Sequence, residues 1–195
     1  MSDGDDTETE LTPARVEALV AEYEDREPFD TVEREQIATL PSALAAGDFG
    51  RRDAEWVVRW YYRRRSGDAP DAELRTAEEA FYDNDYESIA DAIARASEAS
   101  GLDDALAALT SLAGVDTAVA SAFLAFLDPD RYLAVGPREW RALAAVGDLS
   151  GAYPESVSAA DYRAYLDAAR SAVDRLDCDL WDLYRALWRL EGDAW

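Results

Sequence analysis

The stretch Leu109–Leu143 reads LTSLAGVDTAVASAFLAFLDPDRYLAVGPREWRAL and decides the fold. Leucines at helical spacing over 102–112 predict one helix, and the small and apolar residues of 117–127 predict a second. Between them, Gly114-Val115-Asp116 predicts a tight turn. Pro137 starts a further helix, because proline suits the first helical position. The stretch is therefore helical throughout, apart from its turns.

Two helices joined by such a turn form the outline of a helix-hairpin-helix, at about 102–127. A glycine in the turn tolerates positive φ and leaves backbone amides open at the start of the second helix. These amides and the helix dipole bind a phosphate without a basic side chain. The sequence therefore predicts phosphate contacts at Gly114, Val115, Asp116 and Thr117. Asp116 is a good N-cap, but its carboxylate stands where the phosphate would bind.

The hairpin resembles that of the base-excision DNA glycosylases, the endonuclease III-like superfamily. The resemblance covers roughly 35 residues and includes ASA at 120–122, DPDRY at 128–132 and VGPREW at 135–140. It implies a compact, all-α, glycosylase-like multi-helix bundle. It also implies that the carbonyls of Ala113 and Val115 hold a potassium or sodium ion, and no other cofactor is expected.

The catalytic residues of that superfamily are missing. Its lysine and aspartate align with Ala118 and Gly136. The chain is therefore expected to keep the fold without the reaction, which leaves no catalytic residue to assign. In the alternative interpretation the carboxylates are relocated, and Asp128 and Asp130 are then the candidates. A displacement of a catalytic carboxylate by about 1 Å can lower the reaction rate by orders of magnitude, which favours the non-catalytic interpretation.

Composition narrows the chemistry further. The chain has 42 acidic and 19 basic residues, a net charge of −23, and no histidine. All basic residues are arginines, so a lysine Schiff base is excluded. The lack of histidine excludes an imidazole base and a Ser-His-Asp triad. An acidic surface without lysine is a haloarchaeal-type composition, which stays soluble in concentrated salt because salt screens charge repulsion.

The rest of the chain shows no internal repeat and no linker that would divide it. Residues 1–12 are expected to be a disordered acidic tail, and 13–195 a single all-α domain of about nine helical segments. A helix over 32–40 is expected to end at Pro41. No apolar run approaches the roughly 20 residues that span a bilayer, and the acidic start is unlike a signal peptide. We therefore expect a cytoplasmic protein without a membrane partner.

Residues 51–65, RRDAEWVVRWYYRRR, form the one basic island, with six arginines and two acidic residues. Asp53 is expected to cap a helix that runs to Arg65. Arginines bind phosphates and aromatic rings stack on bases, so Arg59, Arg63 and Arg64 are candidate nucleic-acid contacts. In the alternative interpretation, the aromatic residues are core and the arginines pair with acidic residues of neighbouring helices.

Three functions follow from these observations. The first is a non-catalytic helix-hairpin-helix protein that contacts DNA weakly and without sequence preference, alone or within a complex. The second is an adaptor that uses the same fold to bind another protein. The third is a glycosylase-like enzyme with relocated carboxylates.

Overall fold

The computed structural model describes residues 11–65 and 70–192, and these residues form ten α-helices and no strand. The bounds are α1 (Pro13–Arg26), α2 (Asp30–Ala46), α3 (Arg51–Arg64), α4 (Asp71–Tyr82), α5 (Tyr86–Glu98), α6 (Leu102–Leu109), α7 (Thr117–Leu127), α8 (Pro137–Ala145), α9 (Ala159–Leu176) and α10 (Leu180–Gly192). The prediction of an all-α fold is confirmed. The predicted tail at 1–12 lies almost wholly outside the described residues.

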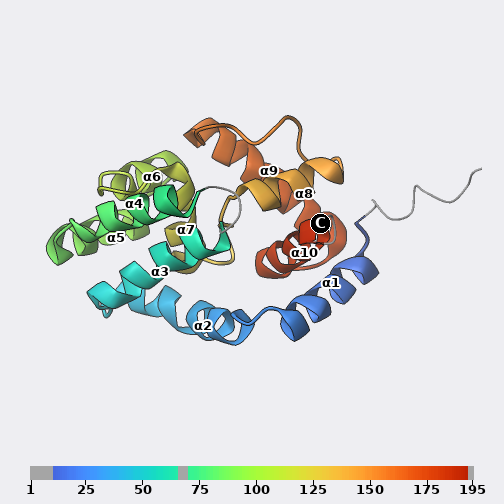
Figure 1. The fold of residues 1–195 in the computed structure, drawn as a ribbon, viewed down its shortest axis with the longest axis horizontal. Helices are drawn as coiled ribbons and strands as arrows, with labels where there is room; N and C mark the ends of the chain where they lie inside the picture. The colour runs from blue at the N-terminus through green and yellow to red at the C-terminus, as the bar shows by residue number, and fades with distance from the viewer. Residues whose placement is uncertain (1–10, 66–69, 193–195) are drawn as a thin grey trace, which may run out of the picture.

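The apolar helix α7 lies at the centre of the molecule (Figure 1). Helices α2, α3, α6 and α9 contact it directly. Helices α4, α5 and α6 gather on one side of the molecule, and α1, α8 and α10 on the other. Because α1 packs against α10, the two ends of the described chain meet. Among the described residues, no helix is long and apolar enough to cross a membrane.

Several helix starts follow directly from the sequence. Thr12, Asp116 and Ser158 are N-caps whose side chains accept a backbone amide of the first turn. At Ser158, the side chain of Asp161 also accepts the cap's own amide at 2.9 Å, which completes the predicted capping box. Helix α7 has the bounds that were predicted for the second helix of the hairpin.

Helix α2 corrects the prediction that a helix ends at Pro41, because it continues through this proline to Ala46. A proline inside a helix removes one hydrogen bond and costs about 3 kcal/mol. Leu40 and Leu44, on either side of it, are buried in the core. Burial of this apolar face compensates the lost hydrogen bond, so the helix persists.

Helix α3 begins at Arg51, two residues before the predicted cap. Gly50 is the N-cap, and the carboxylate of Asp53 accepts its amide at 2.7 Å. Asp53 therefore stabilises the start of the helix from its third position.

The first helix of the predicted hairpin also differs, because α6 ends at Leu109. The hydroxyls of Thr110 and Ser111 donate to the carbonyls of Leu106 and Ala108, at 2.8 and 2.6 Å. Such hydrogen bonds from side chains to the carbonyls of the preceding turn compete with the backbone hydrogen bonds of a helix. The connection between α6 and α7 is therefore longer than a three-residue turn.

Candidate nucleic-acid interface

Helix α3 has a buried side and an outward side. The buried side comprises Ala54, Val57, Trp60, Tyr61 and Arg64, and the outward side comprises Arg52, Trp56, Arg59 and Arg63. The outward residues recur every three or four positions, so they form one stripe along the helix. On this stripe Arg52 and Arg63 are exposed, whereas Trp56 and Arg59 are half-buried.

Arg64 is the one predicted contact of this helix that lies inside the molecule. Its side chain is 6 % exposed, and the guanidinium carbon lies 3.3 Å from the centre of the Trp188 ring. Its Nε donates to the Tyr184 hydroxyl at 3.0 Å, and carboxylate oxygens of Glu27 and Glu33 lie 3.5 and 3.6 Å from Nη1. Burial alone lowers the pKa of this guanidinium, but its interactions with Tyr184 and Glu33 outweigh burial and raise it. Arg64 is therefore charged, and the interactions that hold it are made inside the molecule.

Arg59 and Arg63 stay at the surface. Arg59 makes an ion pair with Glu78 at 3.5 Å and donates to the Tyr82 hydroxyl at 3.5 Å. Arg63 has no hydrogen bond or ion pair with any described residue, although acidic residues outnumber basic ones twofold. An exposed cation without a partner is free to meet an external anion.

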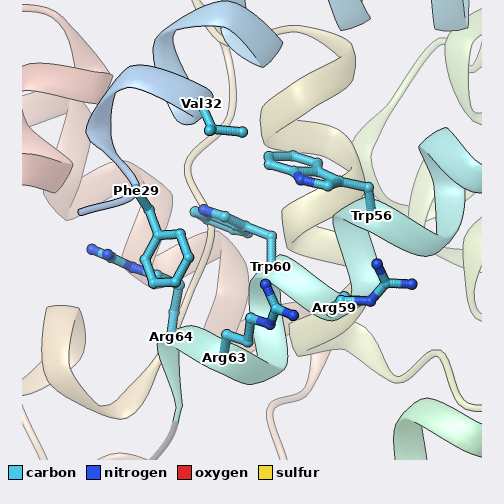
Figure 2. A pocket seen from close by; sticks show the side chains of 7 residues that line it. All are labelled: Phe29, Val32, Trp56, Arg59, Trp60, Arg63 and Arg64. Atoms are coloured by element: carbon cyan, nitrogen blue, oxygen red, sulfur yellow. The ribbon is translucent and has the colours of Figure 1, made fainter. Parts of the chain in front are cut away.

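A small hollow lies beside these two arginines (Figure 2). Phe29, the N-cap residue of α2, and Val32 of α2 lie opposite Trp56 and Trp60 of α3, and the arginine side chains lie along the edge of the hollow. Its volume is about 30 Å³, enough for about one or two water molecules. The surface next to the arginines is therefore apolar and aromatic.

The turn before α7 packs against α4. Gly114 has φ +72°, and a Cβ on it would lie 2.6 Å from the amide nitrogen of Phe81 and 2.7 Å from the carbonyl oxygen of Ala77. Only glycine fits both this conformation and this close backbone contact. The sequence pattern predicted a glycine here for access of a phosphate, whereas the structure gives it a packing role.

Several backbone groups of this turn already form hydrogen bonds with side chains. Asn84 accepts the Ala113 amide and donates to the Ala113 carbonyl, both at 3.0 Å. The carboxylate of Asp116 accepts the amide of Val119 at 2.8 Å, while Thr117 is half-buried and begins α7. The Ala113 carbonyl, one of the two predicted ion ligands, therefore has a hydrogen bond of its own. The ion at Ala113 and Val115 stays a prediction.

The turn and the arginine stripe meet α4 from different sides. Gly114 abuts Ala77 and Phe81, whereas Arg59 pairs with Glu78 and Tyr82, one residue later in each case. One residue corresponds to about 100° around a helix. The two predicted contact regions are neighbours but do not share one side of α4.

Buried hydrogen bonds link position 118 to Val135, the residue before position 136. The hydroxyl of Ser121 donates to the Ala118 carbonyl at 2.6 Å and accepts the Val135 amide at 2.9 Å. The hydroxyls of Tyr162, Tyr165 and Tyr61 donate to the carbonyls of Leu133, Ala134 and Val135 respectively. These bonds satisfy a buried segment that is neither helix nor strand, as burial of a backbone requires. They fix the position of Gly136 at the start of α8.

The space beside Gly136 holds a carboxylate from another residue. A Cβ on Gly136 would lie 2.5 Å from Oε2 of Glu139, which is 4 % exposed. Arg65, Arg138 and Tyr61 line the same small pocket. The carboxylate of Glu139 therefore lies directly beside the backbone of Gly136.

Asp128 and Asp130 follow the C-terminal end of α7, whereas Ala118 lies at its N-terminal end. Asp128 is the residue after the helix and pairs with Arg131 at 3.6 Å, and Asp130 is exposed. The described residues contain no group of three or more acidic or cysteine residues placed to hold a metal ion.

Two surface residues and one buried residue of these sites were not predicted. Phe29 and Val32 reach the arginine stripe from another helix, and no local pattern indicates that contact. Glu139 follows Gly136 by three residues, and this capping spacing was the available signal for it.

No family model matches the chain, and neither the curated proteins nor the solved structures include a match to it.

Proposed function

We propose that this protein is a non-catalytic protein of glycosylase-like, helix-hairpin-helix fold that contacts nucleic acid weakly through the outward stripe of α3. The observation that carries the proposal is Arg63, exposed and without a partner among the described residues of a chain with charge −23. Such a chain offers many carboxylates, so an arginine that pairs with none of them is suited to an external anion.

The stripe has a suitable length for a nucleic-acid backbone. Arg52 and Arg63 are eleven residues apart, which is about 16 Å along a helix. That length corresponds to about five base-pair steps of 3.4 Å. Residues 51–65 carry a net charge of +4, so the attraction is local, and the remaining chain repels phosphate. Binding through this stripe is expected to be weak and independent of sequence, because phosphates carry no sequence information.

The salt dependence of binding tests this proposal. The double variant Arg52→Ala, Arg63→Ala should weaken binding to every duplex alike. The log–log salt slope should become shallower by up to about 2, because each lost phosphate contact removes about 0.9 on duplex DNA. We would measure fluorescence anisotropy of a labelled duplex from moderate to high potassium chloride, with circular dichroism to verify folding at each concentration.

A matched control removes the same charge elsewhere. Arg95 and Arg163 are half exposed and pair with Asp91 and Asp103 on other surfaces. Arg95→Ala, Arg163→Ala should leave the slope nearly unchanged. Equal slopes for the two double variants would contradict a contact at α3. Absence of wild-type binding wherever the protein is folded would refute nucleic-acid binding and leave the adaptor function.

A second candidate function, a glycosylase-like enzyme with a relocated carboxylate, is favoured by the position of Glu139. Its carboxylate occupies the space next to Gly136, where the resemblance places a catalytic aspartate. Asp128 and Asp130 have no comparable position.

Base release from damaged duplexes separates the two candidates. The main proposal predicts that the wild type forms no abasic sites. The second candidate predicts abasic sites that Glu139→Gln reduces at least about 100-fold, the usual contribution of a positioned acid or base. Asp128→Asn serves as the control and should retain full activity. Release that survives Glu139→Gln would refute the relocated carboxylate at this residue.

A further inference from the structure

Phe29 is an aromatic ring that the fold leaves at the surface. It is 40 % exposed, and it makes no ring contact with another aromatic residue of the described chain. The other four phenylalanines all pack against aromatic rings, in the pairs Phe49–Tyr86, Phe81–Phe123 and Phe126–Trp60. The Phe29 ring is therefore the one phenylalanine ring of the described chain that is accessible for stacking from outside.

The surroundings of Phe29 combine apolar surface with positive charge. Val32, which is also 40 % exposed, continues the apolar surface toward the ring of Trp56. Figure 2 shows Arg59 and Arg63 beside this surface, one turn of α3 apart, or about 6 Å. Acidic residues around it have partners inside the protein: Asp30, next to Phe29, pairs with Arg34, Glu78 pairs with Arg59, and the buried Glu33 accepts the Trp60 indole N–H at 2.6 Å.

We infer that this surface binds single-stranded nucleic acid, with one unpaired base lying on the Phe29 ring and its phosphates on Arg59 and Arg63. The inference rests on the proposed function and specifies its ligand. A nucleotide is complementary to this surface, because its base has a flat face that can stack on Phe29 and its phosphate carries a negative charge that can pair with the arginines. The bases of a duplex are stacked on each other, so their faces cannot reach Phe29.

The size of the hollow defines how the base lies. About 30 Å³ is far too small to enclose a nucleobase, so the base covers the opening and stacks on Phe29. Stacking accepts every base, because every base has a π face. The polar groups beside the hollow are guanidinium groups, which contact phosphates. The preference is therefore for single strands over duplexes, without preference for a sequence.

Variants of Phe29 test this inference by separating aromatic from merely apolar contact. Phe29→Leu keeps the apolar surface and removes the stacking face, and it should weaken binding of a labelled thymine 15-mer about fivefold or more. Binding of a 15-base-pair duplex should change by less than twofold. Phe29→Tyr retains the ring and should bind the 15-mer like the wild type. Circular dichroism checks that each variant is folded.

The ligand itself supplies an independent control. A 15-mer of tetrahydrofuran abasic residues has the same phosphates but no bases. The wild type should bind it about as weakly as Phe29→Leu binds the thymine 15-mer.

The outcomes separate this inference from the proposed function. If Phe29→Leu binds the thymine 15-mer as the wild type does while Arg52→Ala, Arg63→Ala still weakens duplex binding, the base site is refuted and the nucleic-acid contact stands. If the wild type binds neither nucleic acid, both are refuted. If the protein binds an acidic peptide, Arg63→Ala weakens that binding, and no oligonucleotide binds, then the surface belongs to a protein partner and the inference is wrong.

Discussion

At Gly114 two backbones meet without a side chain between them. The glycine lies against the Phe81 amide nitrogen and the Ala77 carbonyl oxygen, at distances that a Cβ would reduce to 2.6 and 2.7 Å. Backbone atoms of a helix cannot rotate away as a flexible side chain can. A methyl group at this position must therefore displace α4 or the turn before α7.

Gly114→Ala should destabilise the protein by about 2–5 kcal/mol. The left-handed backbone costs about 1–2 kcal/mol for a residue with a Cβ, and overpacking adds about 1–3 kcal/mol. Gly47→Ala is the matched control, since Gly47 has the same φ of +72° but no atom within 4 Å of its Cβ position. It should lose only the conformational part. Chemical unfolding at constant salt measures both, and equal losses would show that α4 does not press on Gly114.

At the scale of the element, α3 joins the core to the surface. Its buried side carries Arg64 into a cluster with Trp188 and Tyr184 of α10 and with Glu27 and Glu33. Its outward side carries the arginine stripe. Because the buried side is held by charged and aromatic partners, the orientation of the stripe is fixed. The surface proposed for nucleic acid therefore depends on contacts made inside the molecule.

The sequence predicted the helical class and most of the helices, but only part of the candidate site. The sequence indicated Arg59 and Arg63, which lie on the outward stripe of α3, together with Arg64, which does not. It could not show that Arg64 is buried, because that depends on partners from α2 and α10, which are distant in sequence. For the same reason no local pattern indicated that Phe29 reaches α3.

The errors at helix ends have a similar origin. Pro41 ends a helix by local rules, but the buried Leu40 and Leu44 keep α2 intact. Burial of these leucines therefore outweighs a local preference of about 3 kcal/mol. At Gly114 the local pattern indicates a turn, but the close contact of this glycine with α4 involves residues distant in sequence. Such contacts are absent from a single helix or turn and appear only in the assembled fold.

At the scale of the whole molecule, the charge composition controls how stability depends on pH. The chain has no histidine and its basic side chains are all arginines, which stay protonated in proteins. Few side chains therefore titrate between about pH 6 and 8, where a histidine would. The alkaline side is governed by the tyrosines. Burial raises the pKa of Tyr61, Tyr162, Tyr165 and Tyr184 well above 10.

We therefore expect a stability plateau near neutral pH and a steep loss above about pH 10. A raised folded-state pKa means that the folded protein holds protons which the unfolded chain releases near pH 10, so stability is complete below that pH and falls above it. Each such tyrosine removes about 1.4 kcal/mol per pH unit, and four remove about 5–6 kcal/mol. This slope cancels a typical stability of 5–15 kcal/mol within about one to three pH units. Urea unfolding in concentrated potassium chloride, followed by circular dichroism, measures it.

Cys178 should begin this loss earlier and with a shallower slope. Burial, with the negative charges of Asp182 and Asp179, raises the pKa of its thiol from 9.0 to about 11. The unfolded chain ionises its thiol first, so stability should decline slightly between pH 9 and 10. Cys178→Ser should remove that early decline and leave the steep loss above pH 10 unchanged, because the buried tyrosines remain. A stability that stayed constant to pH 12 would contradict the burial of these four hydroxyls. A steep loss that disappeared in Cys178→Ser would assign it to the thiol instead.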